Sequence, residues 1–150
     1  MGLVEKKKNE AASVVDMSVL ETKLGYQIRM ADRIINRDFQ SFVGMTPVQF
    51  SVFALVASNE GLSQVAIGES LAMDRASTMA IVDKLQAADL IERRKATHDR
   101  RMQALFLTEK GKEQFAVVDA RVLEHEKRHV ALFSGEELEQ LKALVSLMRP

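Results

Sequence analysis

Two histidines with the spacing of a metal site stand near the end of a predicted helix. The run from His125 to His129 fits the pattern H-E-x-x-H, in which histidines one helical turn apart can bind zinc while Glu126 acts as a general base. A third ligand is needed in an open cleft, and the glutamates of 136–139 lie too near in sequence for the usual spacing. Packing of His125 and His129 at a helix interface is therefore the prediction, with both kept as weak metal candidates. A zinc-dependent hydrolase and a metal-sensing regulator are the alternatives.

A second group of charged residues lies between positions 92 and 101. This stretch holds five basic residues against two acidic ones, a local excess of +3, whereas the 150-residue chain has 21 of each sign and a formal net charge of zero. The excess coincides with a predicted turn. A cationic turn of this kind favours phosphate contacts over an evenly solvated surface.

The composition excludes several classes of protein. The chain contains no cysteine, so disulfides, thiolate metal sites, cysteine nucleophiles and thiol-based redox sensing are impossible. Apolar stretches fall well short of the roughly 18 residues of a membrane span, and no apolar signal core follows the N-terminal lysines. We expect a cytoplasmic protein with no membrane partner, made of one domain at 15–150 after a disordered arm at 1–14.

Hydrophobic periodicity predicts the helices that position these groups. Apolar residues recur at steps of three or four from Leu20 to Phe42, which predicts one long helix. Threonine, serine or aspartate stands before each of the later helical segments, where such residues cap a helix. The predicted N-terminal caps are Thr46, Ser63, Asp74 and Ser134, and the run Thr108-Glu109-Lys110-Gly111 is predicted to open a long helix.

Between the helical segments lies a strand-like region. Residues 91–94 and 102–107 form two β runs joined by a basic loop, which predicts a hairpin. Two short helices with a tight turn precede this hairpin, as in a helix-turn-helix. The predicted fold class is mainly α with a small β hairpin. It comprises a winged helix-turn-helix lobe at about 46–110 and a helical dimerisation region at about 15–43 and 112–150.

The helix predicted after Asp74 is long enough to enter the major groove of DNA, where base edges are distinguishable. Met79, Val82 and Leu85 would face inward, which leaves a polar surface near the N-terminus to contact bases and phosphates. An arginine at the hairpin tip can enter the minor groove. The residues predicted to contact DNA are Ser63, Gln64, Arg75, Ser77, Thr78, Lys84, Arg93, Arg94, Arg100 and Arg101.

Several short runs of residues occur along this part of the sequence in a characteristic order. They are Ser63 through Leu71, Asp74-Arg75-Ala76-Ser77-Thr78, Val82-Asp83-Lys84-Leu85, Leu90-Ile91, Arg93, Asp99-Arg100-Arg101 and Leu107-Thr108-Glu109-Lys110-Gly111. In these runs the chain resembles the MarR family of transcription regulators, over roughly residues 15 to 150. Two positions depart from the family pattern. Asp89 stands where glycine is usual, in a place that commonly needs a left-handed residue, and Thr97-His98 replaces a common proline of the wing.

The resemblance implies a homodimer that holds two winged helices on a pseudo-palindromic operator. Asp99 would brace a wing arginine, while Arg100 or Arg101 reaches the minor groove. Members commonly repress, and many release DNA when a small anionic aromatic compound binds between the dimerisation helices and the DNA-binding lobe. The implied effector is an aromatic carboxylate or its CoA thioester, with no cofactor and no catalytic residue. The candidate effector-binding residues are Tyr26, Arg29, Arg33, Phe39, Phe50 and Phe53. A module that binds no DNA is a third alternative.

Overall fold

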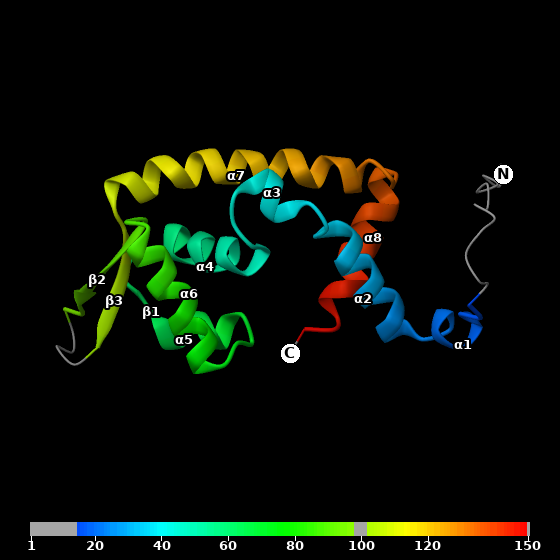
Figure 1. The fold of residues 1–150 in the computed structure, drawn as a ribbon, viewed down its shortest axis with the longest axis horizontal. Coiled ribbons are helices and arrows are strands. Elements are labelled where there is room, and N and C mark those ends of the chain that lie inside the picture. Colours follow the sequence, from blue (N-terminus) through cyan, green and yellow to red (C-terminus); the bar gives the residue numbers. More distant parts are fainter. Residues whose placement is uncertain (1–14, 98–101, 150) are drawn as a thin grey trace. The chain divides into compact units, whose positions relative to one another are not determined.

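The computed structural model describes residues 15–97 and 102–149. The chain divides into two compact units, Met1–Ile34 and Ile35–Pro150, drawn in Figure 1. The predicted arm at 1–14 lies outside the described residues. The predicted division of 15–150 into a winged lobe and a dimerisation region stays a prediction. Among the described residues, no single helix is long and apolar enough to cross a membrane, although one bent pair of helices would qualify by length and composition alone.

The single long helix predicted from Leu20 to Phe42 is wrong, because three helices occupy this stretch. They are α1 (Ser18–Glu21), α2 (Leu24–Ile35) and α3 (Phe39–Val43). After α1, the Thr22 hydroxyl donates to the carbonyl of Val19, and short polar side chains that bond to nearby backbone compete with a continuing helix. The turn before α3 contains Asn36 and Asp38, which favour turns for the same reason. The apolar spacing persists across these breaks, so periodicity alone could not detect them.

The winged lobe is built from three helices and a small sheet. Its elements are α4 (Pro47–Ser58), β1 (Leu62–Ser63), α5 (Gln64–Ser70), α6 (Arg75–Ala87), β2 (Ile91–Lys95) and β3 (Gln103–Leu107). The strands are antiparallel in the order β1-β3-β2, and Leu105 of β3 is paired with both Leu62 and Arg93. The predicted hairpin is confirmed. The two-residue strand β1 was missed because it is too short to show a period.

Every predicted N-terminal cap is confirmed. Thr46 and Ser134 form capping boxes with Gln49 and Glu137, and the side chains of Ser63 and Asp74 accept hydrogen bonds from the backbone N–H three residues on. The structure adds Thr108, which caps the last long helix in the same way. Because a cap satisfies backbone donors that the helix leaves free, it fixes where each helix begins. The two helices after the sheet are α7 (Glu109–Val130) and α8 (Gly135–Ser146).

The core of the second unit lies in two places. The larger part fills the winged lobe and consists of Val52, Phe53, Val56, Ile67, Val82, Leu85, Leu90, Ile91 and Leu105. A smaller cluster of Phe39, Val43 and Val118 joins α3 to α7. Figure 1 shows α7 running from the hairpin at its start to α8 at its end. This helix therefore connects the winged lobe with the second core cluster and α8.

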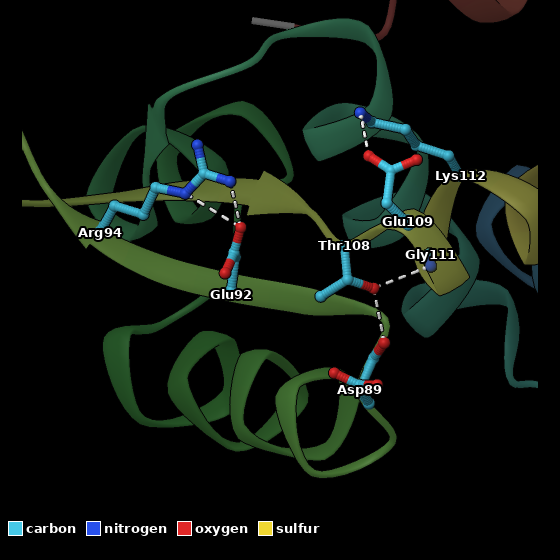
Figure 2. Close-up of polar contacts among 7 residues, drawn as sticks. All are labelled: Asp89, Glu92, Arg94, Thr108, Glu109, Gly111 and Lys112. Atoms are coloured by element: carbon cyan, nitrogen blue, oxygen red, sulfur yellow. Dashed lines mark hydrogen bonds and ion pairs between the residues drawn. The ribbon is translucent and has the colours of Figure 1, made fainter.

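The junction between α6 and α7 is held by hydrogen bonds from the Thr108 side chain to backbone groups, shown in Figure 2. Asp89 has φ +59°, so the left-handed conformation predicted at this position is confirmed. The Thr108 hydroxyl donates to the carbonyl of Asp89 at 2.6 Å and accepts from the Gly111 N–H at 2.8 Å. Gly111 packs so closely that a Cβ there would lie 1.9 Å from the carbonyl oxygen of Leu90. The start of α7 is thus locked to the chain leaving α6.

Candidate nucleic-acid interface and adjoining cavity

The exposed surface of α6 begins at its first turn. Asp74 caps the helix through the backbone N–H of Ser77 at 2.8 Å, and the Ser77 hydroxyl donates to the same carboxylate at 2.7 Å. Both hydrogen bonds hold the pKa of Asp74 below its usual value. Arg75, at the first helical position, and Lys84 are exposed. These two cations and Ser77 stand on the surface predicted to meet DNA.

The structure corrects the predicted faces of α6 at two residues. Thr78 is 1% exposed and its hydroxyl donates to the carbonyl of Asp74 at 2.8 Å, so it cannot contact a base in this conformation. Met79, predicted to face inward, is 49% exposed. The inward stripe is instead Thr78, Val82 and Leu85. Helix α5 packs close to this stripe, and a small residue is needed at position 68: a Cβ on Gly68 would lie 3.0 Å from the Thr78 hydroxyl oxygen.

Residues from three elements meet beside the N-terminus of α6. A surface hollow is lined by Ser63, Gln64, Val65, Arg75, Met102 and Gln103, which come from the start of α5, the start of α6 and the end of the wing. The Ser63 hydroxyl is already used as a cap for the Ala66 N–H. The structure therefore gathers Ser63, Gln64 and Arg75 as predicted, with Ser63 in a capping role.

Arg93, on strand β2 of the hairpin, bonds to side chains of α6. Its guanidinium contacts Asp83 at 2.6 Å and the side-chain oxygen of Gln86, both on α6, and lies 3.4 Å from the side-chain oxygen of Gln64 on α5. Because its side chain is only 20% exposed, Arg93 is committed to these partners. Sequence reasoning missed Asp83, whose spacing from Arg93 gives no periodic signal.

Of the other predicted wing cations, the structure describes Arg94 but not Arg100 or Arg101. Arg94 pairs with Glu92 (Figure 2) and lies 4.6 Å above the ring of Phe106. Contacts of Arg93 and Arg94 with phosphate stay predictions. The remaining predicted wing residues, Asp99, Arg100 and Arg101, lie outside the described residues.

A cavity of about 440 Å³ lies within the second unit, lined by residues of α3, α4, α7 and α8. Its walls are mainly apolar, with a few polar groups. Lining residues include Phe39, Phe50, Phe133, His125, His129 and Lys142. Two of the six predicted effector residues, Phe39 and Phe50, are therefore found there. Phe133 and Lys142 were missed because the α8 segment was interpreted only as a dimer helix.

The other predicted effector residues have different positions. Phe53 is fully buried in the core of the winged lobe, edge-on to Phe115 at 5.3 Å, so its assignment to a ligand pocket is wrong. Its helical spacing is shared by core and pocket residues, and the sequence could not separate them. Tyr26, Arg29 and Arg33 belong to α2 in the first unit, and their role in effector binding stays a prediction.

The histidine pair meets an acidic residue that the sequence did not indicate. His125 is 2% exposed, and its Nε2 lies 2.9 Å from Oδ1 of Asp38. Since a carboxylate can only accept, Nε2 carries the hydrogen. This hydrogen bond, with a smaller contribution from the charge of Arg128, holds the pKa of Asp38 below its usual value. The predicted packing of His125 at a helix interface is confirmed. The third possible metal ligand near the two histidines is Asp38, not a glutamate of 136–139.

The capped recognition helix, its partner α5 and the hairpin beside it define a winged helix-turn-helix protein. Comparison with known proteins agrees and goes further. A family model described as the MarR family matches residues 43–102. The transcriptional repressor CouR, bound to a 23-mer DNA duplex, is 31% identical with a TM-score of 0.84, covering 91% of this chain and 99% of that one. The chain belongs to the MarR family and is a DNA-binding transcriptional regulator.

A second CouR structure and one further relative have the same character. CouR bound to p-coumaroyl-CoA is 29% identical, with a TM-score of 0.80 and coverage of 88% of this chain and 95% of that one. The transcriptional regulator YybA of Bacillus subtilis is 28% identical over 135 residues, which are 89% of this chain and 88% of YybA. The similarity therefore extends beyond the winged lobe into the helices that flank it.

Proposed function

We propose that this protein is a homodimeric repressor that binds a pseudo-palindromic operator and leaves it when an aromatic acid or its CoA thioester binds in the cavity beside α7. The observation that carries this proposal is α7 itself. Its first turn is locked to the winged lobe at Thr108 and Gly111, and its last turns line the cavity with His125 and His129. A ligand in the cavity thus contacts the same rigid element that supports the wing.

Dimerisation is supported by apolar surface that a monomer leaves in water. Helix α8 has no buried residue, although it and its flanks carry many large apolar side chains. The exposed members are Leu132, Leu141, Leu144, Val145, Leu147 and Met148. Many large apolar side chains exposed along one helix and its flanks are typical of an interaction site. Two copies would also supply two recognition helices for successive major grooves of one duplex.

Light scattering is expected to give twice the 16.8 kDa chain mass at low micromolar concentration. Selection from a random duplex pool should then return inverted half-sites whose centres are about 10 to 10.5 bp apart, one helical turn. A stable monomer that binds a single half-site would contradict the proposed dimer. Binding to no duplex even at low salt would contradict the reading of α6 as a recognition helix.

Effector binding is supported by the composition of the cavity. Phe39, Phe50 and Phe133 supply aromatic walls, and Lys142 supplies a cation at the edge. This combination suits a ring that carries a carboxylate or thioester, since pockets usually combine apolar walls with a few polar groups that orient the ligand. The likeness to CouR bound to p-coumaroyl-CoA supports the same ligand class. A ligand that favours the DNA-free state by about 1 to 3 kcal/mol would weaken operator binding roughly 5- to 150-fold.

Lys142→Ala should weaken effector binding and leave operator affinity without effector unchanged. The change removes a cation from the cavity lining, so the Kd for an aromatic acid or acyl-CoA should rise about 10- to 150-fold, the size of one charge-assisted hydrogen bond. Thermal-shift screening would identify a ligand, and calorimetry would measure its Kd. Lys127→Ala is the matched control, because both lysines form an exposed ion pair with a glutamate three residues earlier. Equal Kd values for both variants would place the ligand elsewhere.

A further inference from the structure

Three side chains of the kind that bind metal ions converge beside the cavity. Asp38 comes from the turn before α3, and His125 and His129 come from successive turns of α7. One ligand atom from each lies within 4.8 Å of the others. Asp38 is 87 residues from His125 in the sequence, so the fold brings this group together.

We propose that Asp38, His125 and His129 form a binding site for a divalent transition-metal ion, for which Zn²⁺ is the best match. Two imidazole nitrogens and one carboxylate oxygen suit zinc, whereas magnesium and calcium prefer all-oxygen sites. Three protein ligands would leave a fourth position free, as in zinc sites that take an exchangeable ligand. This proposal does not depend on the identity of the effector.

The distances require only a local adjustment. Zinc bonds to nitrogen and oxygen are about 2.0 to 2.1 Å, so ligand atoms around a tetrahedral ion stand about 3.3 to 3.4 Å apart. The Asp38 Oδ1 and His125 Nε2 atoms are 2.9 Å apart and would separate by a few tenths of an ångström. The remaining distances, of up to 4.8 Å, shorten if His129 rotates. His129 is only half-buried, so it has room to do so.

The surroundings of the site orient its ligands. Arg128 donates to Oδ2 of Asp38 at 3.1 Å, with its guanidinium carbon 4.2 Å from the centre of the Phe42 ring. That contact leaves Oδ1 as the ligand atom and supplies the outer hydrogen bond that metal-bound carboxylates usually accept. The ring of His125 is held edge-on to Phe39 at 5.1 Å. Arg128 therefore neutralises the carboxylate oxygen that does not face the ion.

Metal binding would replace the hydrogen shared by Asp38 and His125. The imidazole must be a free base at the coordinating nitrogen, so Nε2 gives up its proton as the ion binds: a neutral ring carries its hydrogen on Nδ1 instead, and a protonated ring releases one proton to solvent. Because both histidines line the cavity, the fourth coordination position would face it. The ion would then tie the turn before α3 to α7 and offer a Lewis acid to a small anion or water in the cavity.

The test uses the full-length protein after treatment with a chelator. Co²⁺ titration should produce visible absorption of a low-symmetry site at one ion per chain, and competition with a chromophoric chelator should give the Zn²⁺ affinity. Asp38→Asn and His129→Ala should each weaken Zn²⁺ binding on the order of 100-fold, at the upper end of the effect of losing a supporting group. His98→Ala is the matched control, because the sequence has three histidines and this one lies outside the proposed site.

Thermal unfolding separates loss of the site from loss of the fold. Without metal, His129→Ala should unfold close to the wild-type temperature, since this half-buried side chain is not part of the core clusters. Zn²⁺ should raise the unfolding temperature of the wild type and of His98→Ala, and leave that of His129→Ala unchanged. The same Zn²⁺ affinity in all variants, or a greater loss in His98→Ala than in His129→Ala, would overturn the proposal.

Discussion

Gly111→Ala is expected to lower the free energy of unfolding by about 3 kcal/mol, at the upper end of what overpacking costs. A methyl group at this position would lie 1.9 Å from the carbonyl oxygen of Leu90 and 2.9 Å from its carbonyl carbon. Both atoms belong to the backbone, and the same carbonyl accepts the N–H of Thr108 at 3.2 Å. Neither of these two backbone segments can move aside without breaking the junction between α6 and α7. The unfolding temperature should fall by roughly 6 to 12 °C for a chain of this size.

Gly135→Ala supplies the control for this prediction. Gly135 is also near the start of a helix, but a Cβ there would meet nothing within 4 Å. That substitution should leave stability unchanged or raise it by up to about 1 kcal/mol, because alanine favours a helix more than glycine does. Circular dichroism melts of the two variants measure the difference. Equal melting temperatures would show that α6 and α7 are not locked together at Gly111.

Arg75→Ala should reduce operator affinity at least about 30-fold while the protein stays folded and its oligomeric state is unchanged. The residue is exposed at the first position of α6, in the hollow beside Gln64 and the wing, where it can reach bases or phosphates. Loss of one such contact costs about 1 to 3 kcal/mol. A dimer on two half-sites loses it twice, so about 2 kcal/mol is the lower limit, which corresponds to the 30-fold change. Fluorescence anisotropy with a labelled operator measures the effect.

The same measurement on Lys127→Ala tests whether charge alone explains the loss. Lys127 is an exposed cation near the C-terminal end of α7, far along the helix from the wing (Figure 1). At physiological salt the Debye length is about 8 Å, so removing this charge should change affinity less than threefold, a fraction of one contact. If Arg75→Ala bound the operator as tightly as this control, the N-terminal turn of α6 would not be part of the interface.

The elements that could be predicted were those fixed by local chemistry. A cap such as Thr46 is visible in the sequence because its oxygen bonds a backbone N–H three residues away. The left-handed residue at Asp89 was expected from the family resemblance, because glycine is usual at that position. Such features need no knowledge of distant residues, and they were enough to define the winged lobe.

Features set by contacts between distant residues were missed. Thr78 faces inward, close to Gly68 of another helix, and an apolar period cannot anticipate a buried threonine whose hydroxyl donates to a carbonyl of its own helix. The partner of His125 was missed because Asp38 is 87 residues away and no local pattern links them. Phe53 shows the opposite error, since a core phenylalanine and a pocket phenylalanine have the same spacing.

The continuity of α7 has a mechanical consequence. Its 22 residues correspond to a rod of about 33 Å. One end of this rod is held against the carbonyl groups of Asp89 and Leu90, and residues near the other end line the cavity. A rod of that length that pivots by about 3° carries its far end through about 1.7 Å. Hydrogen bonds to DNA tolerate only about half an ångström. Under the proposed function, α7 would act as a lever: a small tilt set by a ligand in the cavity would be enough to release DNA without a hinge or refolding.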